Sequence, residues 1–473
     1  MNLNSFLLMR HEIVLIAVAL IILIAEIFTS PQNKGRIRGL AIILFAINTI
    51  IGFFPATTGT IFGGMFTTIP LHIVVKNILN IGTLIVIIQS NTWLKSEENQ
   101  DKISEFYFLL ISTLVGMFYM ISAGDFLMFY LGLELATIPL ALLVAFDRMR
   151  SQSAEGGIKL ILSSAFSSGI MLYGISMIYG MYGSIYFDML SPAIALNSLT
   201  ILAFIFFFAG MAFKISLVPF HLWAADVYEG APVNVTSYLS VVSKGAAVFI
   251  LTVILFKVFP TISEVWQKAV WVIAVMTMTI GNLFAIRQQN LKRFLAFSSI
   301  SQAGFLLLGI IGGNEMGMTA IVYYMLVYIF SNLGAFGVIA AISNQSGKEN
   351  IDDYNGLYHT NPKLSLTMML ALFSLAGIPP VAGFFGKFFL FTAAAQKGFY
   401  ILVLIATINT IISLYYYLLV VKAMFINKSE TPIPYFKSDA MTKLGLGICI
   451  AGLLIVGFAS GIWEMITKLA FGM

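Results

Sequence analysis

Long apolar segments recur along the whole 473-residue chain. Each is about 17–25 residues long, which is the length that a helix needs to cross a hydrocarbon core of about 30 Å. We expect about fourteen such segments, starting near residues 11, 38, 69, 104, 125, 156, 199, 233, 266, 291, 317, 363, 399 and 442. The expected fold class is therefore an all-α polytopic membrane protein.

Composition leaves little room for a soluble domain. Hydrophobic residues make up 59% of the chain and charged residues 10%, against about 25% charged residues in an ordinary soluble protein. The longest polar gaps lie at about 92–104, 344–362 and 427–441. We expect the first apolar run, His11 to Thr29, to be a retained helix, because it is too long for the apolar core of a signal peptide and lacks a small-residue cleavage site. The single Cys449 is expected to be an inert core residue.

Positive charge gathers in alternate loops. If there are fourteen spans, the loops after the odd-numbered helices hold most of the 26 lysines and arginines. The positive-inside rule then places those loops in the cytoplasm and both termini on the periplasmic side. The net charge of +5 is explained by this asymmetry, and no nucleic-acid partner is needed.

Two spans contain residues that break helices. Pro219 interrupts the seventh span within FKISLVPFHLW (213–223), and Pro379-Pro380 interrupts the twelfth within GIPPVAGFFGKFF (377–389). Proline removes a helical hydrogen bond and clashes with the preceding turn. Broken helices in corresponding positions indicate inverted repeats, although proline kinks are also common in ordinary membrane helices.

The breaks lie five spans apart, so two units would have opposite orientations in the membrane. We predict two inverted five-helix repeats, helices 4–8 and 9–13, with helices 7 and 12 discontinuous. We expect one membrane domain, 1–473, which these repeats divide into four parts. Its parts are 1–103 (three N-terminal helices), 104–258 (first repeat), 259–426 (second repeat) and 427–473 (C-terminal helix).

Four ionisable residues lie near the middle of apolar spans: Glu134, Lys214, Lys244 and Lys387. A charge at the centre of a membrane helix costs roughly 2.5–3.5 kcal/mol, so such residues normally face a bundle interior and mark ion pathways or proton relays. The candidate site is a proton relay through these four residues. A neutral, hydrogen-bonded Glu134 is the structural alternative, and Lys387 could instead cap carbonyls freed at Pro379-Pro380.

Lys214 and Glu134 suggest a switch. Burial disfavours a charged lysine, while a nearby carboxylate favours it. Moving or protonating Glu134 would then make Lys214 release its proton, and Lys244 would let the proton pass laterally toward Lys387.

Further residues have competing interpretations. Lys159 and His221 are candidate relay members, but Lys159 could be an interfacial anchor and His221 a hydrogen-bonded core residue. Asp226 and Glu229 are expected to form a vestibule at the cytoplasmic end of helix 7. Lys76 is expected at an interface or subunit contact, and the remaining histidines at the surface or an interface: His11, His72 and His359.

Redox chemistry has no sequence support. One cysteine cannot ligate an iron–sulfur cluster, and the chain has no convincing pair of haem histidines and no glycine-rich dinucleotide loop. No metal or cofactor site is expected in this chain.

Several segments together carry a family resemblance: LGLEL (131–135), FKISLVPFHLWAADVYEGAP (213–232), SKGA (243–246), NLKRFLAFSSISQAGFLL (290–307) and GIPPVAGFFGKFFLF (377–391). The chain resembles the antiporter-like subunits of respiratory complex I and the related multi-subunit cation/proton antiporters. Within that family it is most similar to the N-type subunits of bacterial NADH:quinone oxidoreductase, because Lys387 stands where M-type subunits have glutamate and the long lateral helix of L-type subunits is missing.

The resemblance implies a redox-inactive, proton-translocating subunit in a bacterial inner membrane. Its relay would be Glu134, Lys214, Lys244 and Lys387, with Lys159 matching a further lysine. NADH, FMN, iron–sulfur clusters and a quinone would belong to other subunits, and the partners would be the M, K and J membrane subunits. One departure is Gln302, where this family often has a titratable histidine.

Two other functions stay open. The chain could serve a cation/proton antiporter or a membrane-bound hydrogenase, which neighbouring genes would reveal. A stand-alone solute transporter would need a midplane pocket for a molecule, whereas this sequence offers a row of lysines.

Overall fold

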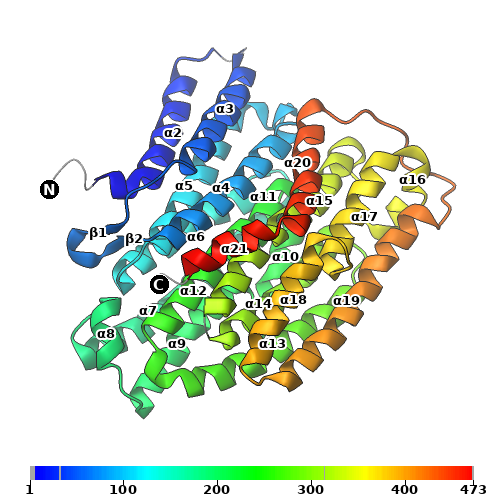
Figure 1. Cartoon of the computed structure of the whole chain (residues 1–473). Helices are drawn as coiled ribbons and strands as arrows, with labels where there is room; N and C mark the ends of the chain where they lie inside the picture. The colour runs from blue at the N-terminus through cyan, green and yellow to red at the C-terminus, as the bar shows by residue number, and fades with distance from the viewer. Residues whose placement is uncertain (1–5, 31–32, 314, 471–473) are drawn as a thin grey trace.

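The computed structural model describes residues 6–30, 33–313 and 315–470, and most of them belong to helices that run side by side (Figure 1). The long helices, in chain order, are α2 (Arg10–Ile27), α3 (Gly35–Gly52), α4 (Pro70–Ser90), α5 (Ile103–Ile121), α6 (Phe126–Val144), α7 (Ser151–Tyr182), α9 (Ser198–Ile215), α12 (Lys244–Lys257), α13 (Ser263–Ile286), α14 (Leu291–Gly312), α15 (Glu315–Ser346), α17 (Pro362–Ala376), α18 (Ala382–Gln396), α19 (Tyr400–Phe425) and α20 (Ala440–Phe458).

Shorter elements join or extend these helices. They are the strands β1 (Gly59–Ile61) and β2 (Phe66–Thr68) and the helices α8 (Phe187–Ala193), α10 (Leu222–Gly230), α11 (Val233–Tyr238), α16 (Leu357–Thr360) and α21 (Ser460–Ala470). A π-helical turn, Leu239–Ser243, joins α11 to α12. Single 3₁₀ turns complete the order: Leu7–Met9, Phe62–Gly64, Trp93–Lys95, Gln100–Lys102, Pro260–Ile262 and Ile351–Tyr354.

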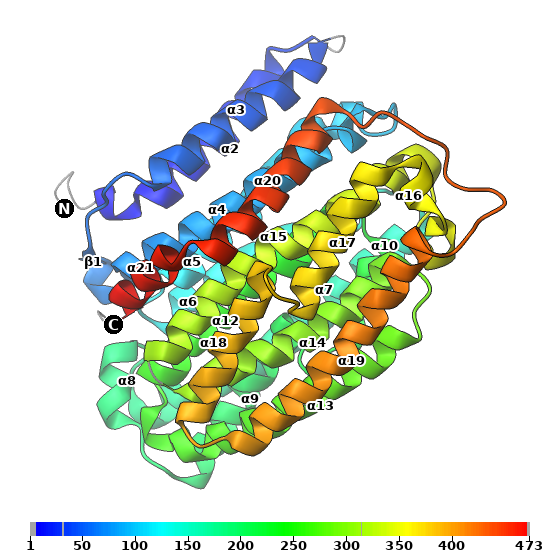
Figure 2. The same cartoon turned by 45° about the vertical axis from the view of Figure 1, so that its right-hand side comes forward.

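The expected number of spans is confirmed. Within the described residues, 13 helices are long and apolar enough to cross a membrane. The remaining expected span, near residue 363, consists of the two shorter helices α17 and α18, which meet end to end (Figure 2). An all-α polytopic membrane fold is therefore correct.

Both predicted helix breaks are present, and they are built alike. Helix α9 is followed by the capping residue Ser216 (φ 64°), and α17 by Gly377 (φ 86°). In each case the following residue donates its N–H to a carbonyl five residues back: Leu217 to Ala212 at 2.8 Å and Ile378 to Phe373 at 3.0 Å. This Schellman closure satisfies carbonyls at the end of the helix, so each break exposes little unpaired backbone to the surrounding helices.

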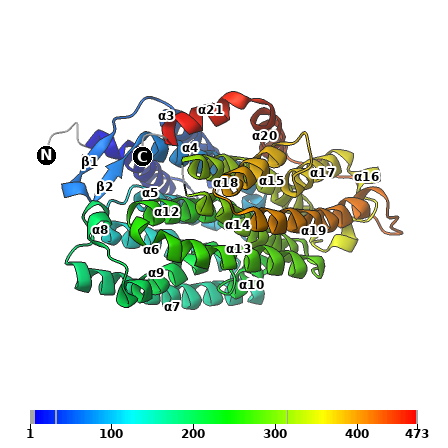
Figure 3. The same ribbon diagram turned by 60° about the horizontal axis from the view of Figure 1, so that its bottom comes forward.

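The central helices are covered on all sides by others. All of the most apolar window of α14 is buried, as is 94% of that of α15, whereas α3 and α19 bury only a third. Figure 3 shows α12 and α14 enclosed within the bundle, with α7 and α19 toward the outside. A helix that is apolar all round is a buried one, and the sequences of α14 and α15 have that character.

The two ends of the bundle differ. The β1–β2 hairpin pairs Gly59 with Thr68 and Ile61 with Phe66, and it lies with α8 at one end, while α16 lies at the other (Figures 1 and 2). The turn Leu7–Met9 packs against the hairpin, and α21 lies near it (Figure 2). The hairpin, α8 and α21 are elements that the apolar pattern did not predict.

Candidate functional site

Lys214 and Glu134 border the same small cavity. Lys214 lies in the last turn of α9, is 8% exposed and donates a hydrogen bond to the Thr137 hydroxyl at 2.7 Å. Glu134 lies one helical turn before Thr137 on α6, and its buried Oε1 has no hydrogen-bond partner among the described residues. Serines of α7 complete the cavity, which leaves about 10 Å³ for the centre of a water molecule. That volume is close to what a single water needs.

No direct ion pair joins Lys214 to Glu134 among the described residues. The Thr137 hydroxyl accepts from Lys214 and donates to the Leu133 carbonyl at 2.6 Å, so it does not link Lys214 to the Glu134 carboxylate. Contact between the acid and the lysine would therefore need a bridging water or a side-chain movement.

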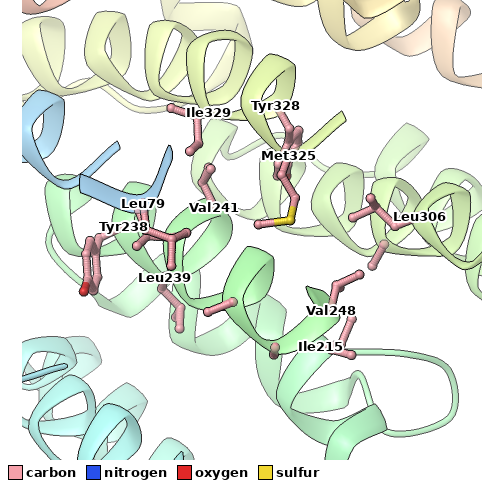
Figure 4. Close-up of a cluster of buried hydrophobic side chains, with 14 of the residues drawn as sticks. Leu79, Ile215, Tyr238, Leu239, Val241, Val248, Leu306, Met325, Tyr328 and Ile329 are labelled. Carbon is pink, nitrogen blue, oxygen red and sulfur yellow. The ribbon is translucent and has the colours of Figure 1, made fainter. Parts of the chain in front are cut away.

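Lys244 begins α12, directly after the π-helical turn, and is 4% exposed. Its ammonium donates to the Ser299 hydroxyl at 2.7 Å and lies 5.6 Å from the centre of the Tyr228 ring. The surrounding cavity is mostly apolar, and Figure 4 shows its side chains Leu79, Val241, Val248, Leu306, Met325, Tyr328 and Ile329. Among the described residues, the favourable contacts of this ammonium are thus the Ser299 hydroxyl and the face of the Tyr228 ring.

Lys387 lies in the first turns of α18, beside the second helix break. It is 3% exposed, donates to the Ala376 carbonyl at 3.2 Å and lies 4.5 Å from the centre of the Phe305 ring. Ala376 ends α17, so Lys387 does occupy the carbonyl-capping position considered above. That contact is compatible with a relay role as well, because a carbonyl cannot neutralise the ammonium charge.

Gln302 links the middle of the molecule to Lys387. Its Nε2 donates to the Leu375 carbonyl at 3.1 Å, next to the carbonyl that Lys387 caps. Its Oε1 accepts a hydrogen bond from the Tyr324 hydroxyl. The side chain that replaces the expected histidine is therefore fully engaged at the end of α17.

Tyrosines extend this hydrogen-bonded group. The Tyr417 hydroxyl of α19 accepts from Gln302 at 3.2 Å and contacts the Ser298 hydroxyl at 2.5 Å. Ser298, Ser299 and Gln302 are all on α14, so this one helix presents polar groups to Lys244 on one side and to the Lys387 region on the other. Helix α14 thus contacts Lys244 through Ser299 and, through Gln302, bonds the carbonyl next to the one that Lys387 caps.

Lys159 lies in a separate charged cluster. It forms ion pairs with Glu155 and Asp226, each at 2.7 Å, and Arg293 pairs with Asp226 at 2.7 Å and Glu229 at 2.8 Å. These residues line a cavity of about 220 Å³. Asp226 and Glu229 thus border a polar cavity, as expected for a vestibule, and they tie α7, α10 and α14 together.

Three sequence-based placements are wrong. Lys76 is fully buried and forms an ion pair with Glu12, while His11 and His72 are each 4% exposed. They were expected at the surface or an interface, yet the hairpin folds over this end of the bundle and bonds Leu8 and Ser122. His221 is buried next to the first break and its Nδ1 has no partner among the described residues, whereas His359 is exposed.

Sequence reasoning missed the hydroxyl partners: Thr137, Ser298, Ser299, Tyr324 and Tyr417. A signal existed for two of them, since the SSIS run places serines in an otherwise apolar span. Which lysine each hydroxyl meets depends on how separate helices pack.

Comparisons with known proteins agree with this architecture. The family described as NADH:quinone oxidoreductase/Mrp antiporter, transmembrane region, matches residues 123–413. NADH-quinone oxidoreductase subunit N of Phocaeicola vulgatus is 52% identical over 471 residues, which cover 99% of this chain and 100% of that protein. The chain belongs to the NADH-quinone oxidoreductase subunit N family.

Other members and structures are similar over nearly the same length. Subunit N of Rhodospirillum rubrum is 35% identical and covers 92% of this chain and 91% of its own. A chain of respiratory complex I from Thermus thermophilus with bound aureothin is 27% identical to this chain, with a TM-score of 0.80. The match covers 95% of this chain and 97% of the Thermus chain. A chain of the Mrp complex from Dietzia shares the fold, with a TM-score of 0.85 at 20% identity over 99% of this chain and 97% of its own.

Proposed function

We propose that this chain carries protons through Glu134, Lys214, Lys244 and Lys387, as a redox-inactive membrane subunit of a proton-translocating NADH:quinone oxidoreductase. Electron transfer elsewhere in the complex would drive the movement. NADH, FMN, the iron–sulfur clusters and the quinone would be held by other subunits.

One observation carries the proposal. Among the described residues, none of the three relay lysines lies within ion-pair distance of a carboxylate; each donates to a hydroxyl or a carbonyl. A buried lysine without a counter-charge is costly to keep charged. Residues kept in that condition in three different helices are suited to passing protons, because a small change in their surroundings decides whether they hold one.

The contacts support a lateral path. Lys244 donates to Ser299 of α14. Further along the same helix, Gln302 bonds Tyr324 and the Leu375 carbonyl, which is next to the carbonyl that Lys387 caps. Gln302 cannot titrate, so it would orient a water or hydroxyl chain rather than hold the proton. Lys159 and His221 would belong to the cytoplasmic side of the path.

The inverted repeats also belong to this proposal. The matching breaks at Ser216 and Gly377 support the division into residues 104–258 and 259–426, with three helices before and one after. We further infer an inner-membrane location with both termini periplasmic, and M, K and J subunits as neighbours. The alternating loop charges and the family's complex I context support these finer statements.

Lys214→Met tests the relay. Losing a group that transfers protons should cut pumping roughly ten-fold or more, with the complex still assembled. Protons moved per NADH oxidised would be measured in inverted membrane vesicles, and assembly on native gels. Lys268→Met, at an exposed lysine, is the matched control. Unchanged pumping in the Lys214 variant would refute the relay, and loss of the assembled complex alone would assign Lys214 a structural role.

A further inference from the structure

A second group of buried ionisable residues lies outside the relay, among the first three long helices. The Lys76 ammonium of α4 forms an ion pair with Glu12 of α2 at 2.6 Å, and both side chains are completely buried. It also donates to the Ser122 hydroxyl at 2.6 Å, just after α5. The rings of Phe66 and Phe118 lie 5.3 and 5.8 Å from the ammonium.

The pair lies close to one end of the bundle. Lys76 is six residues into α4, or about 9 Å along the helix. The hairpin covers this end, since the Thr67 N–H donates to the Ser122 carbonyl at 2.8 Å. The pair is therefore separated from the hairpin side of the membrane by little more than β1 and β2.

Two atoms of this group are free to take up protons. The Glu12 Oε2 and the His72 Nε2 are buried without a hydrogen-bond partner among the described residues. The His72 Nδ1 contacts the Thr67 carbonyl at 3.1 Å. A carbonyl only accepts, so Nδ1 carries the hydrogen and Nε2 presents a lone pair. His72 precedes Lys76 by one helical turn on α4.

Buried polar residues follow the pair along α4. Asn80 and Thr83 follow Lys76 at helical spacing on α4, and both are buried. Asn80 accepts from Asn48 at 3.2 Å, and its own Nδ2 is unpartnered among the described residues. Thr83 interacts with the hydroxyl of Tyr238, the last residue of α11 before the turn that leads to Lys244.

Stability alone is a weak explanation of the pair. The desolvation of two fully buried charges often exceeds their attraction, so a buried ion pair is often no better for stability than apolar side chains. The same three helices already pack through an apolar core that includes Leu15, Ile22 and Leu79.

We propose that Glu12, Lys76 and His72 form a second protonatable site, at which protons arriving from the relay are held and released on the hairpin side. This inference rests on the proposed proton-translocating function. A proton arriving on Oε2 of Glu12 neutralises the carboxylate. Lys76 then gives one of its protons to Nε2 of His72, which releases it. The Glu12 proton passes to the neutral Lys76 amine, and the ion pair is restored with one proton taken in and one released.

The double variant Glu12→Gln, Lys76→Met tests the site without leaving a lone buried charge. We expect the complex to assemble in normal amounts and to lose proton pumping per NADH oxidised. An assembled complex that pumps normally would overturn the proposal and leave the pair a structural link.

His72→Phe is the second variant, because it preserves the ring contact with Phe249 and removes only the nitrogens. Reduced pumping with an unchanged melting temperature of the complex supports the site. Normal pumping overturns it, whatever the double variant does. His359→Phe, at the exposed histidine, is the control and should behave as wild type.

Lys214→Met in the same assays separates the two proposals. If it loses pumping while the Glu12–Lys76 and His72 variants keep it, only the second site fails. If Lys214→Met pumps normally, the relay itself fails.

Discussion

Individual lysines in this protein meet two kinds of surroundings. Lys76 faces a carboxylate at ion-pair distance, whereas Lys214, Lys244 and Lys387 face hydroxyls or carbonyls. A carboxylate fixes the charge of a lysine, while a neutral acceptor leaves it sensitive to what approaches. The two environments suit a holding site and a transfer path respectively.

Glu134 and Lys214 should be energetically coupled although no direct ion pair joins them. They border one cavity, so we expect an interaction free energy of roughly 0.5–3 kcal/mol, the range seen for neighbouring residues. The measurement is a double-mutant cycle on pumping rates with Glu134→Gln and Lys214→Met. Strictly additive losses would show that Glu134 acts independently of this lysine.

Charged positions were predictable from sequence, but their partners were not. A charge in an apolar span is costly and usually has a function, and for this reason four residues stood out: Glu134, Lys214, Lys244 and Lys387. Thr137 and Ser299 do not stand out, because a hydroxyl in a membrane helix can bond its own backbone at no great cost.

At the scale of the helix, the two breaks should respond oppositely to substitution. Gly377→Ala places a side chain at φ 86° and brings its Cβ to 3.1 Å from Cδ of Lys387, so it should destabilise the complex by about 1–2 kcal/mol. Ser216→Gly removes a similar strain at φ 64° and should stabilise by up to about 1 kcal/mol, less the entropy cost of glycine.

Thermal unfolding of the complex would measure both changes. Gly447→Ala is the control, since nothing lies within 4 Å of its Cβ position. Equal effects at Ser216 and Gly377 would contradict the strain argument.

The start of α20 should carry a pH-dependent contribution. Asp439 caps this helix and pairs with Lys95 at 2.9 Å, and the hydrogen bond from Lys95 holds the pKa of Asp439 below its ordinary value. A lowered folded-state pKa gives a stabilisation that is complete above the unfolded value of about 3.9 and is lost as the pH falls through the folded value. The pair is partly exposed, so its contribution should be at most about 1 kcal/mol.

Asp439→Asn isolates that contribution, because asparagine can still cap the helix. Its melting temperature should lie below that of the wild type at neutral pH and converge with it below about pH 4. Glu464→Gln, at an exposed carboxylate, should leave the pH profile unchanged. A constant difference between Asp439→Asn and wild type at every pH would rule out this ion pair as the cause.

Element boundaries followed the apolar pattern wherever a helix spans the bilayer. Pro219 and Pro379-Pro380 marked the breaks correctly, because proline acts through local backbone geometry. The hairpin, α8 and α21 were missed because short interfacial elements have no long apolar run. Because the hairpin was missed, Lys76 and His72 were wrongly expected at a surface or an interface.

For the whole molecule, orientation can be tested with two exposed methionines at opposite ends. Met149 lies between α6 and α7, and Met189 lies in α8. We expect an impermeant maleimide to label Met189→Cys in spheroplasts and Met149→Cys only in inverted vesicles. The native Cys449 is buried, so the unmodified protein is the blank. The opposite pattern would reverse the proposed topology.

The depth of α12 and α14 within the bundle has a consequence for how the bilayer acts on this protein. Changes in lipid thickness or headgroup charge reach these helices only through the ones around them. Lys244, Ser299 and Gln302 are therefore insulated from the composition of the membrane. Glu134, on the half-buried α6, lies nearer to the lipid or neighbouring subunits around the bundle. We therefore expect the surroundings of the bundle to affect Glu134 more than these three residues.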